Sequence, residues 1–131
     1  MSEKAARMND CIFCNQADLT VVDENRLALA FRDNYPVTEG HTLIISKRHA
    51  ATYFDLTEEE VIAVNALLHS QKSAIQTEDN TVVAFNIGMN AGEAAGQTVF
   101  HCHIHLIPRR EGDVENPRGG IRHTIPGKGF Y

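Results

Sequence analysis

The chain has 131 residues, 43% of them hydrophobic, which suits one compact domain and is too short for two ordinary ones. Its net charge of -5 argues against a surface for long nucleic acid, although a small phosphorylated ligand held by backbone donors remains compatible. Nowhere do about 18 apolar residues run together, so we expect no membrane span, and three cysteines suit a reducing cytoplasm better than a disulfide framework.

The first half of the chain predicts a tail followed by two strands. Residues 1–10 are polar and charged, without an apolar stretch of signal-peptide length, so a flexible tail is expected there. Apolar runs predict strands at 27–31 and 41–46, and Pro36 and Gly40 favour a turn between them. The second strand delivers His49 to its end, which makes that histidine a candidate for a site.

One long helix is predicted to begin at Thr57. Thr57 and Glu60 have the spacing of a capping box, and acidic residues fill the first turn, where the helix dipole favours them. Apolar residues then follow helical spacing to about Gln76, namely Val61, Val64, Leu67, Leu68 and Ile75. The pattern indicates an amphipathic helix of roughly five turns.

Two more strands are predicted at 81–87 and 98–108, with a glycine-rich connection between them. Gly88, Gly92 and Gly96 let the backbone approach a ligand and expose amide donors, as an anion cradle requires, but a flexible hairpin loop explains them equally well. Residues 110–131 predict an extended tail. Its stretch from Arg118 to His123 could reach a phosphate, although a solvated tail or an interface arm is the simpler interpretation.

The strand predicted at 98–108 carries the most informative pattern in the chain. His101, His103 and His105 are two residues apart, so in a strand all three imidazoles point to one face. Such a row can bind a metal, can supply a nucleophile with supporting acid and base groups, or can divide these tasks.

Cys11 and Cys14 have the two-residue spacer with which two thiolates grip one zinc ion from a tight turn. No second pair of this kind exists, so zinc would complete its shell with two histidines, and His49 and His101 are the strand-associated candidates. Four protein ligands would leave no open position, so the ion would be structural. A redox pair and two inert thiols are the alternatives.

The segment from Gly96 to Arg109 resembles the signature of the histidine triad, or HIT, family of nucleotide hydrolases and transferases. The similarity extends back through Asp33 to Pro36, Gly40 to Leu43 and Lys47 to His49, and so spans roughly residues 11–109. With its paired cysteines, the chain looks most like the zinc-containing bacterial branch, close to the diadenosine polyphosphate hydrolases. Residues 110–131 match less well.

The resemblance implies a reaction at the α-phosphate of a nucleoside phosphate, either a dinucleoside polyphosphate or a nucleoside phosphoramidate. It makes His103 the nucleophile that forms a covalent nucleotidyl-histidine, with His105 and Gln97 supporting it, and no metal is needed for the chemistry. The free nitrogen of His103 requires its other nitrogen to donate to a backbone carbonyl. Substrate contacts are implied for Asp33, Asn34, Asn90, Gly96, Gln97, Thr98, Val99, His103 and His105.

The implied fold is α+β, an antiparallel sheet of about five strands with one long helix, a short N-terminal helical turn and an irregular C-terminal tail. The implied partners are a purine nucleotide and a second copy of the chain, whose sheet joins this one. Two rivals stay open: a metal held by all three alternating histidines at an open site, and a nucleotide-binding or partner-interaction module without turnover. His41, His69 and His123 are assigned no role.

Overall fold

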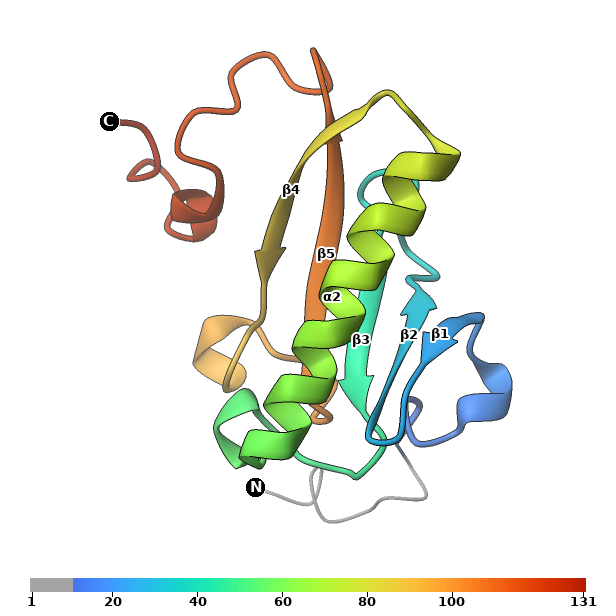
Figure 1. Cartoon of the computed structure of the whole chain (residues 1–131). Helices are drawn as coiled ribbons and strands as arrows, with labels where there is room; N and C mark the ends of the chain where they lie inside the picture. The colour runs from blue at the N-terminus through green and yellow to red at the C-terminus, as the bar shows by residue number, and fades with distance from the viewer. Residues whose placement is uncertain (1–10) are drawn as a thin grey trace.

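One antiparallel sheet with a long helix across one face forms the core of the molecule (Figure 1). The computed structural model describes residues 11–131. In that part of the chain the sheet has five strands in the order β1-β2-β3-β5-β4. They are β1 (Val21–Glu24), β2 (Ala28–Arg32), β3 (Thr42–Ser46), β4 (Val82–Gly88) and β5 (His103–Arg110). The helix is α2 (Glu58–Glu78), and short 3-10 turns are η2 (Gln16–Asp18), η3 (Tyr53–Asp55), η4 (Glu93–Ala95) and η5 (Gly120–Thr124).

This architecture confirms the implied α+β fold, including the helical turn near the N-terminus. The residue pattern alone predicts four strands and misses β1. That strand has only two apolar residues, Val21 and Val22, both exposed, and it lies at an edge of the sheet. An edge strand with little buried surface has no need of the apolar run by which strands are found in a sequence.

Helix α2 begins where the capping box predicts. The Thr57 side chain accepts from the backbone N–H of Glu60, and the Glu60 carboxylate accepts from the backbone N–H of Thr57. Val64, Leu67 and Ile75 are buried on one stripe, so the helix covers the sheet with its apolar face. Within residues 11–131, no helix has the apolar length that a membrane crossing needs.

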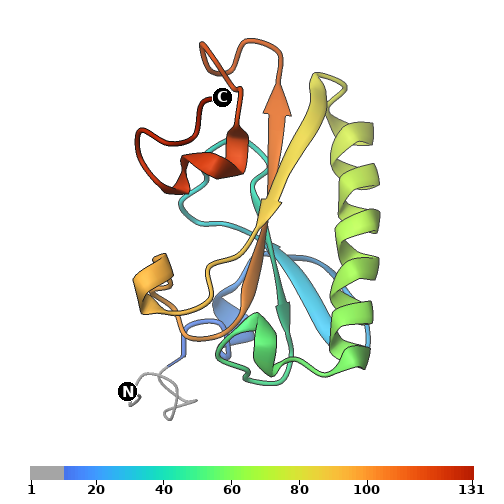
Figure 2. The same ribbon diagram turned by 90° about the vertical axis from the view of Figure 1, so that its left-hand side faces the viewer.

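The two central strands are buried on both faces, which explains their continuous apolar sequences. Ala28, Ala30 and Ile44 face α2, whereas their neighbours along the strands face the opposite side. That opposite layer contains Leu29, Phe31, Leu43 and Ile45, and the segment from Cys11 to Phe13 covers it. Figure 2 shows the helix on one side of the sheet and the C-terminal tail on the other.

Strand β5 is shorter at its beginning than the predicted strand 98–108, because it starts at His103. Its register pairs Ile45 with His103 and Leu43 with His105, so both imidazoles share the sheet face that α2 does not cover. His101 instead lies in a bend before the strand. Strand alternation therefore orients two of the three histidines, and the third is placed by other contacts.

The C-terminal tail is mostly irregular, but it contains one element that was not predicted, the 3-10 turn η5. The tail packs on itself, with the guanidinium groups of Arg118 and Arg122 over the ring of Tyr131 at 5.2 and 4.6 Å from its centroid. These arginines are not among the residues that line the large cavity described below.

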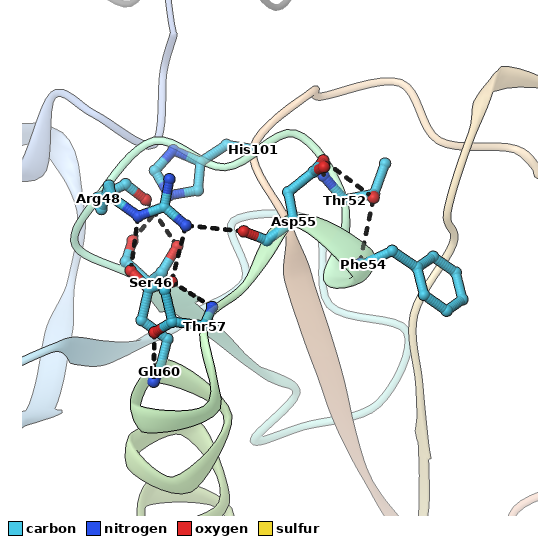
Figure 3. Close-up of polar contacts among 8 residues, drawn as sticks. All are labelled: Ser46, Arg48, Thr52, Phe54, Asp55, Thr57, Glu60 and His101. Carbon is cyan, nitrogen blue, oxygen red and sulfur yellow. Dashed lines mark hydrogen bonds and ion pairs between the residues drawn. The ribbon is translucent and has the colours of Figure 1, made fainter.

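An ion pair fastens the start of α2 to the loop after β3. Two nitrogens of Arg48 donate to the two carboxylate oxygens of Glu60 at 2.9 and 2.8 Å, and one also donates to the carbonyl of Asp55 (Figure 3). Glu60 is 4% exposed, and the hydrogen bond from Arg48 lowers the pKa of its carboxyl against the opposing effect of burial. The pair therefore stabilises a position next to His49.

We predict that Arg48→Met lowers the free energy of unfolding at pH 7 by about 1–3 kcal/mol, because a buried carboxylate loses its charged partner. The folded pKa of Glu60 is below the ordinary glutamate value of 4.5, so this contribution is present above that value and is lost as pH falls through the folded pKa. Urea denaturation at pH 7 and at about pH 3 measures it. The variant and wild type should converge in acid. Arg26→Met, at an exposed arginine outside this network, is the control, and an equal loss at both pH values would contradict the prediction.

Candidate active site and metal centre

Four side chains from three separate segments converge beside the central strands. Cys11 and Cys14 come from a tight turn in which the Cys14 N–H donates to the Cys11 carbonyl, while His49 follows β3 and His101 precedes β5. One ligand atom from each residue lies within 4.8 Å of all the others. The Nδ1 atom of His101 is 3.4 Å from both sulfurs, and that of His49 is 3.2 Å from the sulfur of Cys14.

These residues fit a tetrahedral zinc ion. With ordinary Zn–S and Zn–N bond lengths, sulfur and nitrogen at two corners of a tetrahedron are about 3.5 Å apart, close to the separations here. His101 also has the outer contact typical of a metal-bound imidazole, because its Nε2–H donates to the Ser46 carbonyl at 2.8 Å (Figure 3). Burial and the adjacent Cys11 raise the pKa of Cys14 to about 11, so thiolates here need a cation.

A cavity of about 570 Å³ opens on the same side of the sheet, within the size range of small-molecule sites. One part of its wall is apolar and is formed by Ile12, Phe13, Leu19, Phe31 and Leu43. The polar part includes Asp33, Asn34, Thr98, His103 and His105. An apolar slot beside polar groups and imidazoles has the chemistry to take a nucleotide, with the base against the apolar wall and the phosphate facing the histidines.

His103 has one nitrogen committed and one free. Its Nδ1–H donates to the carbonyl of His101 at 2.8 Å, which confirms the hydrogen bond expected from the sequence. The proton is therefore on Nδ1, and Nε2 carries a lone pair. Burial lowers the pKa of the His103 imidazole below its ordinary value, although this hydrogen bond and Asp33 oppose the shift, so the ring is neutral near pH 7.

A chain of hydrogen bonds sets the opposite tautomer at His105. The backbone N–H of Val37 donates to Nδ1 of His41 at 3.1 Å, so the proton of His41 is on Nε2. That Nε2–H points to Nδ1 of His105 at 2.9 Å and is 3.5 Å from a carboxylate oxygen of Asp33. Nδ1 of His105 is thus an acceptor, and its Nε2 carries a hydrogen. The cavity therefore has one imidazole with a lone pair and one with a donor.

His105 stays uncharged at physiological pH. Burial, followed by the neighbouring His103 and His41, lowers the pKa of His105 to about 4, so the ring stays neutral at physiological pH. Burial also lowers the pKa of His41, although Asp33 opposes that shift. A neutral relay keeps the tautomers fixed, since no ring gains a second proton.

The structure places the expected site residues in two groups. Asp33, Asn34, Thr98, Val99, His103 and His105 line the cavity, whereas Asn90, Gly96 and Gln97 do not. Asn90 is half-buried, and Gly96 ends η4 with a positive φ of 97°. Gln97 is 2% exposed; its amide donates to the carbonyls of Ala51 and Val99 and accepts from Gly92. In this geometry Gln97 shapes the loop and does not face the cavity.

Two kinds of site residue were missed in the sequence. His41, which was assigned no role, forms the link between Val37 and His105, and a histidine at the start of a buried strand was the available signal. The sequence pattern also does not identify the apolar wall of the cavity, although Ile12 and Phe13, between the two cysteines, could have indicated it. His69 is exposed on α2, and Nε2 of His123 donates to the Arg118 carbonyl at 2.8 Å within the tail.

A metal held by the three alternating histidines does not agree with the geometry. In residues 11–131, the groups with converging ligand atoms are the cysteine–histidine cluster and the trio Asp33, His41 and His105. Neither group contains His103. The trio is explained by the hydrogen bond between its two imidazoles, whose nitrogens at 2.9 Å are closer than the roughly 3.3 Å between two nitrogens on one zinc ion.

Known proteins are similar to this chain in both sequence and fold. Residues 15–112 match the family described as HIT domain. A HIT family protein of known structure from Bacillus anthracis is 44% identical with a TM-score of 0.73, and the match covers 79% of this chain and 76% of that one. A zinc-bound histidine triad family protein from Mycobacterium smegmatis is 35% identical with a TM-score of 0.74, covering 82% and 80%.

A curated relative, adenylylsulfatase HINT3 of Arabidopsis thaliana, is 35% identical over 115 residues, which are 85% of this chain and 58% of that protein. The match to the family covers most of the chain, including the five strands, His49 and His101, and every residue that lines the cavity except Ile12 and Phe13. The chain belongs to the HIT-domain family.

Proposed function

We propose that the protein cleaves a nucleoside phosphate at its α-phosphorus, acting as a hydrolase or nucleotidyl transferase through a covalent nucleotidyl-histidine. The substrate class is a dinucleoside polyphosphate or a nucleoside phosphoramidate. The observation that carries the proposal is the hydrogen bond from Nδ1 of His103 to the His101 carbonyl, because it leaves an unprotonated Nε2 on a ring that lines the cavity. The relative named as an adenylylsulfatase is consistent with chemistry at phosphorus.

In the first step, the lone pair on Nε2 of His103 forms a bond to the α-phosphorus. The bond from phosphorus to the leaving group breaks, and the leaving group keeps the electron pair. In the second step, water attacks the same phosphorus and the electron pair of the P–N bond returns to His103, while one O–H bond of the water breaks and its proton passes to solvent or to the departed leaving group. The products are the free leaving group and a nucleoside monophosphate.

Fixed donors reduce the cost of charge on the phosphoryl oxygens in both steps. The Nε2–H of His105 is one donor, since the other nitrogen of that ring accepts from His41. The backbone amides near Thr98 and Val99, at the cavity wall, are the others. In this proposal Asp33 binds the ribose hydroxyls, and the apolar wall of the cavity, which includes Phe13 and Phe31, contacts a purine base. Gln97 supports this arrangement as a positioning residue.

The cluster of Cys11, Cys14, His49 and His101 is proposed to hold one zinc ion. Four protein ligands complete a tetrahedron, so the ion has a structural role and the chemistry needs no metal. The zinc-bound relative supports this assignment.

We further propose that two copies of the chain associate through β4. This strand is at an edge of the sheet, so its outer backbone groups can pair with a second strand, and Val83 and Ile87 on it are exposed. The compartment proposed is the reducing cytoplasm, where the three cysteines, all free in the structure, stay reduced.

The alternative is a module that binds a purine nucleotide without useful turnover. The same cavity serves both functions, so the two proposals differ only in whether His103 forms a bond to phosphorus. Mass spectrometry of the protein mixed with adenylated substrates distinguishes them, because the enzyme acquires an adenylate on His103 and the binding module does not.

We predict that His103→Ala reduces hydrolysis of an adenosine phosphoramidate by about a thousandfold or more, while AMP affinity changes only a few-fold, because the substitution removes the nucleophile from an otherwise intact cavity. Steady-state kinetics and calorimetry measure the two effects. His69→Ala, at an exposed helix position, should behave as wild type. Turnover in His103→Ala near the wild-type rate would rule out the proposed nucleophile.

We predict that His41→Phe lowers kcat by roughly tenfold or more with a smaller change in KM, because His105 loses the donor that fixes its tautomer. Substitution by Gln, which retains an N–H donor, should recover part of the rate. Equal kcat values for wild type and His41→Phe would show that the relay has no role in the reaction.

The protein is predicted to contain about one zinc ion per chain, and Cys14→Ser should weaken zinc binding and lower the melting temperature together. Elemental analysis and thermal unfolding provide the readouts. Cys102→Ala is the matched cysteine control, since Cys102 is buried among core residues against α2 and should leave the zinc content unchanged. A metal-free protein with the melting temperature of the loaded one would exclude a structural role.

A further inference from the structure

The turn that carries two of the metal ligands is also a wall of the nucleotide cavity. Ile12 and Phe13 lie between Cys11 and Cys14, and both line the cavity. Phe13 is 7% exposed, its ring centroid is 5.0 Å from that of His103, and the two planes meet edge to face at 76°. On its other side, Phe13 packs on Phe31 at 5.2 Å. A movement of this turn therefore moves the wall and removes a support of the nucleophile.

A second connection runs through the backbone of His101. Its Nδ1 faces the two sulfurs, its Nε2–H donates to Ser46, and its carbonyl accepts from Nδ1 of His103 at 2.8 Å. The residue that completes the metal shell thus also sets the tautomer of the nucleophile. Two independent contacts, one through Phe13 and one through the His101 carbonyl, join the metal centre to the same imidazole.

Neutral thiols hold this turn weakly without a cation. An S–H group is a weak donor and a weak acceptor, whereas a thiolate bound to zinc fixes the position of its backbone. Within residues 11–131, the turn also has its internal hydrogen bond and the apolar packing of Cys11 and Phe13. Removal of the ion is therefore expected to loosen the turn before it disturbs the paired central strands.

We propose that metal binding and nucleotide binding are coupled through the Cys11 to Cys14 turn, with Phe13 as the positioning residue that transmits the coupling. The proposal rests on the proposed function, because it takes the cavity as a nucleotide site. Bound zinc then fixes the positions of the apolar cavity wall and of the His103 ring, in addition to stabilising the fold. Thermodynamic linkage requires the effect to be reciprocal, so bound nucleotide must strengthen zinc binding by the same factor.

The test measures AMP affinity by calorimetry for zinc-loaded and metal-free protein, with circular dichroism to check that the metal-free chain is folded. We expect zinc removal to weaken AMP binding about tenfold, within the range usual for coupled sites. Chelator competition on loaded protein should show zinc held about tenfold more tightly with saturating AMP. Equal AMP affinity with and without zinc overturns the coupling alone. Absence of AMP binding to loaded protein overturns the proposed function as well.

Variants at Phe13 separate this coupling from a general effect of zinc on folding. In Phe13→Ala, all metal ligands remain, and the protection of zinc by AMP, compared at equal AMP saturation, should fall well below that of wild type, because only the contact through the His101 carbonyl is left. Phe13→Leu, which retains an apolar side chain, should keep more of the protection than Phe13→Ala. The matched control is Phe54→Ala, because Phe54 is 82% exposed and does not line the cavity. If the metal-free chain unfolds, this comparison decides the question, and equal protection in Phe13→Ala and wild type overturns the proposal.

Discussion

The hydrogen bond from His103 to the carbonyl of His101 is the interaction on which the candidate active site depends. It joins two residues of one short segment, so it needs no distant partner, but it forms only if the chain bends before β5. The bend is held by the Cys102 N–H, which donates to the Ala50 carbonyl at 2.7 Å, and by the His101 ring against Ser46. One local kink thus separates His101, a candidate metal ligand, from His103, the proposed nucleophile.

The central strands give this kink a rigid base. Strands β2 and β3 are buried on both faces, and the pairing of β3 with β5 sets which side His103 and His105 occupy. A shift of one residue in that register would turn both imidazoles toward α2. Helix α2 contributes no residue to the lining of the large cavity, and its contribution to the site is the support of the sheet from behind.

Much of this arrangement is readable from the sequence because it follows from local patterns. The capping box places the start of α2 at Thr57, and the spacing of Cys11 and Cys14 predicts the metal pair. The resemblance supplies the five-stranded sheet that the apolar pattern alone undercounts. Two features escape such reading. His41 acts through a partner 64 positions away, and the bend at His101 depends on contacts with the loop after β3.

The buried amide of Gln97 has a consequence for the energetics of ligand binding. Its three hydrogen bonds, to Gly92, Ala51 and Val99, connect the middle of the glycine-rich loop and the segment that follows it to the segment after His49. The glycines therefore serve the shape of the loop, and the amides at Thr98 and Val99, the proposed phosphate donors, are held in place by the fold itself. Ordering a mobile loop costs conformational entropy on association, and here folding has already met that cost.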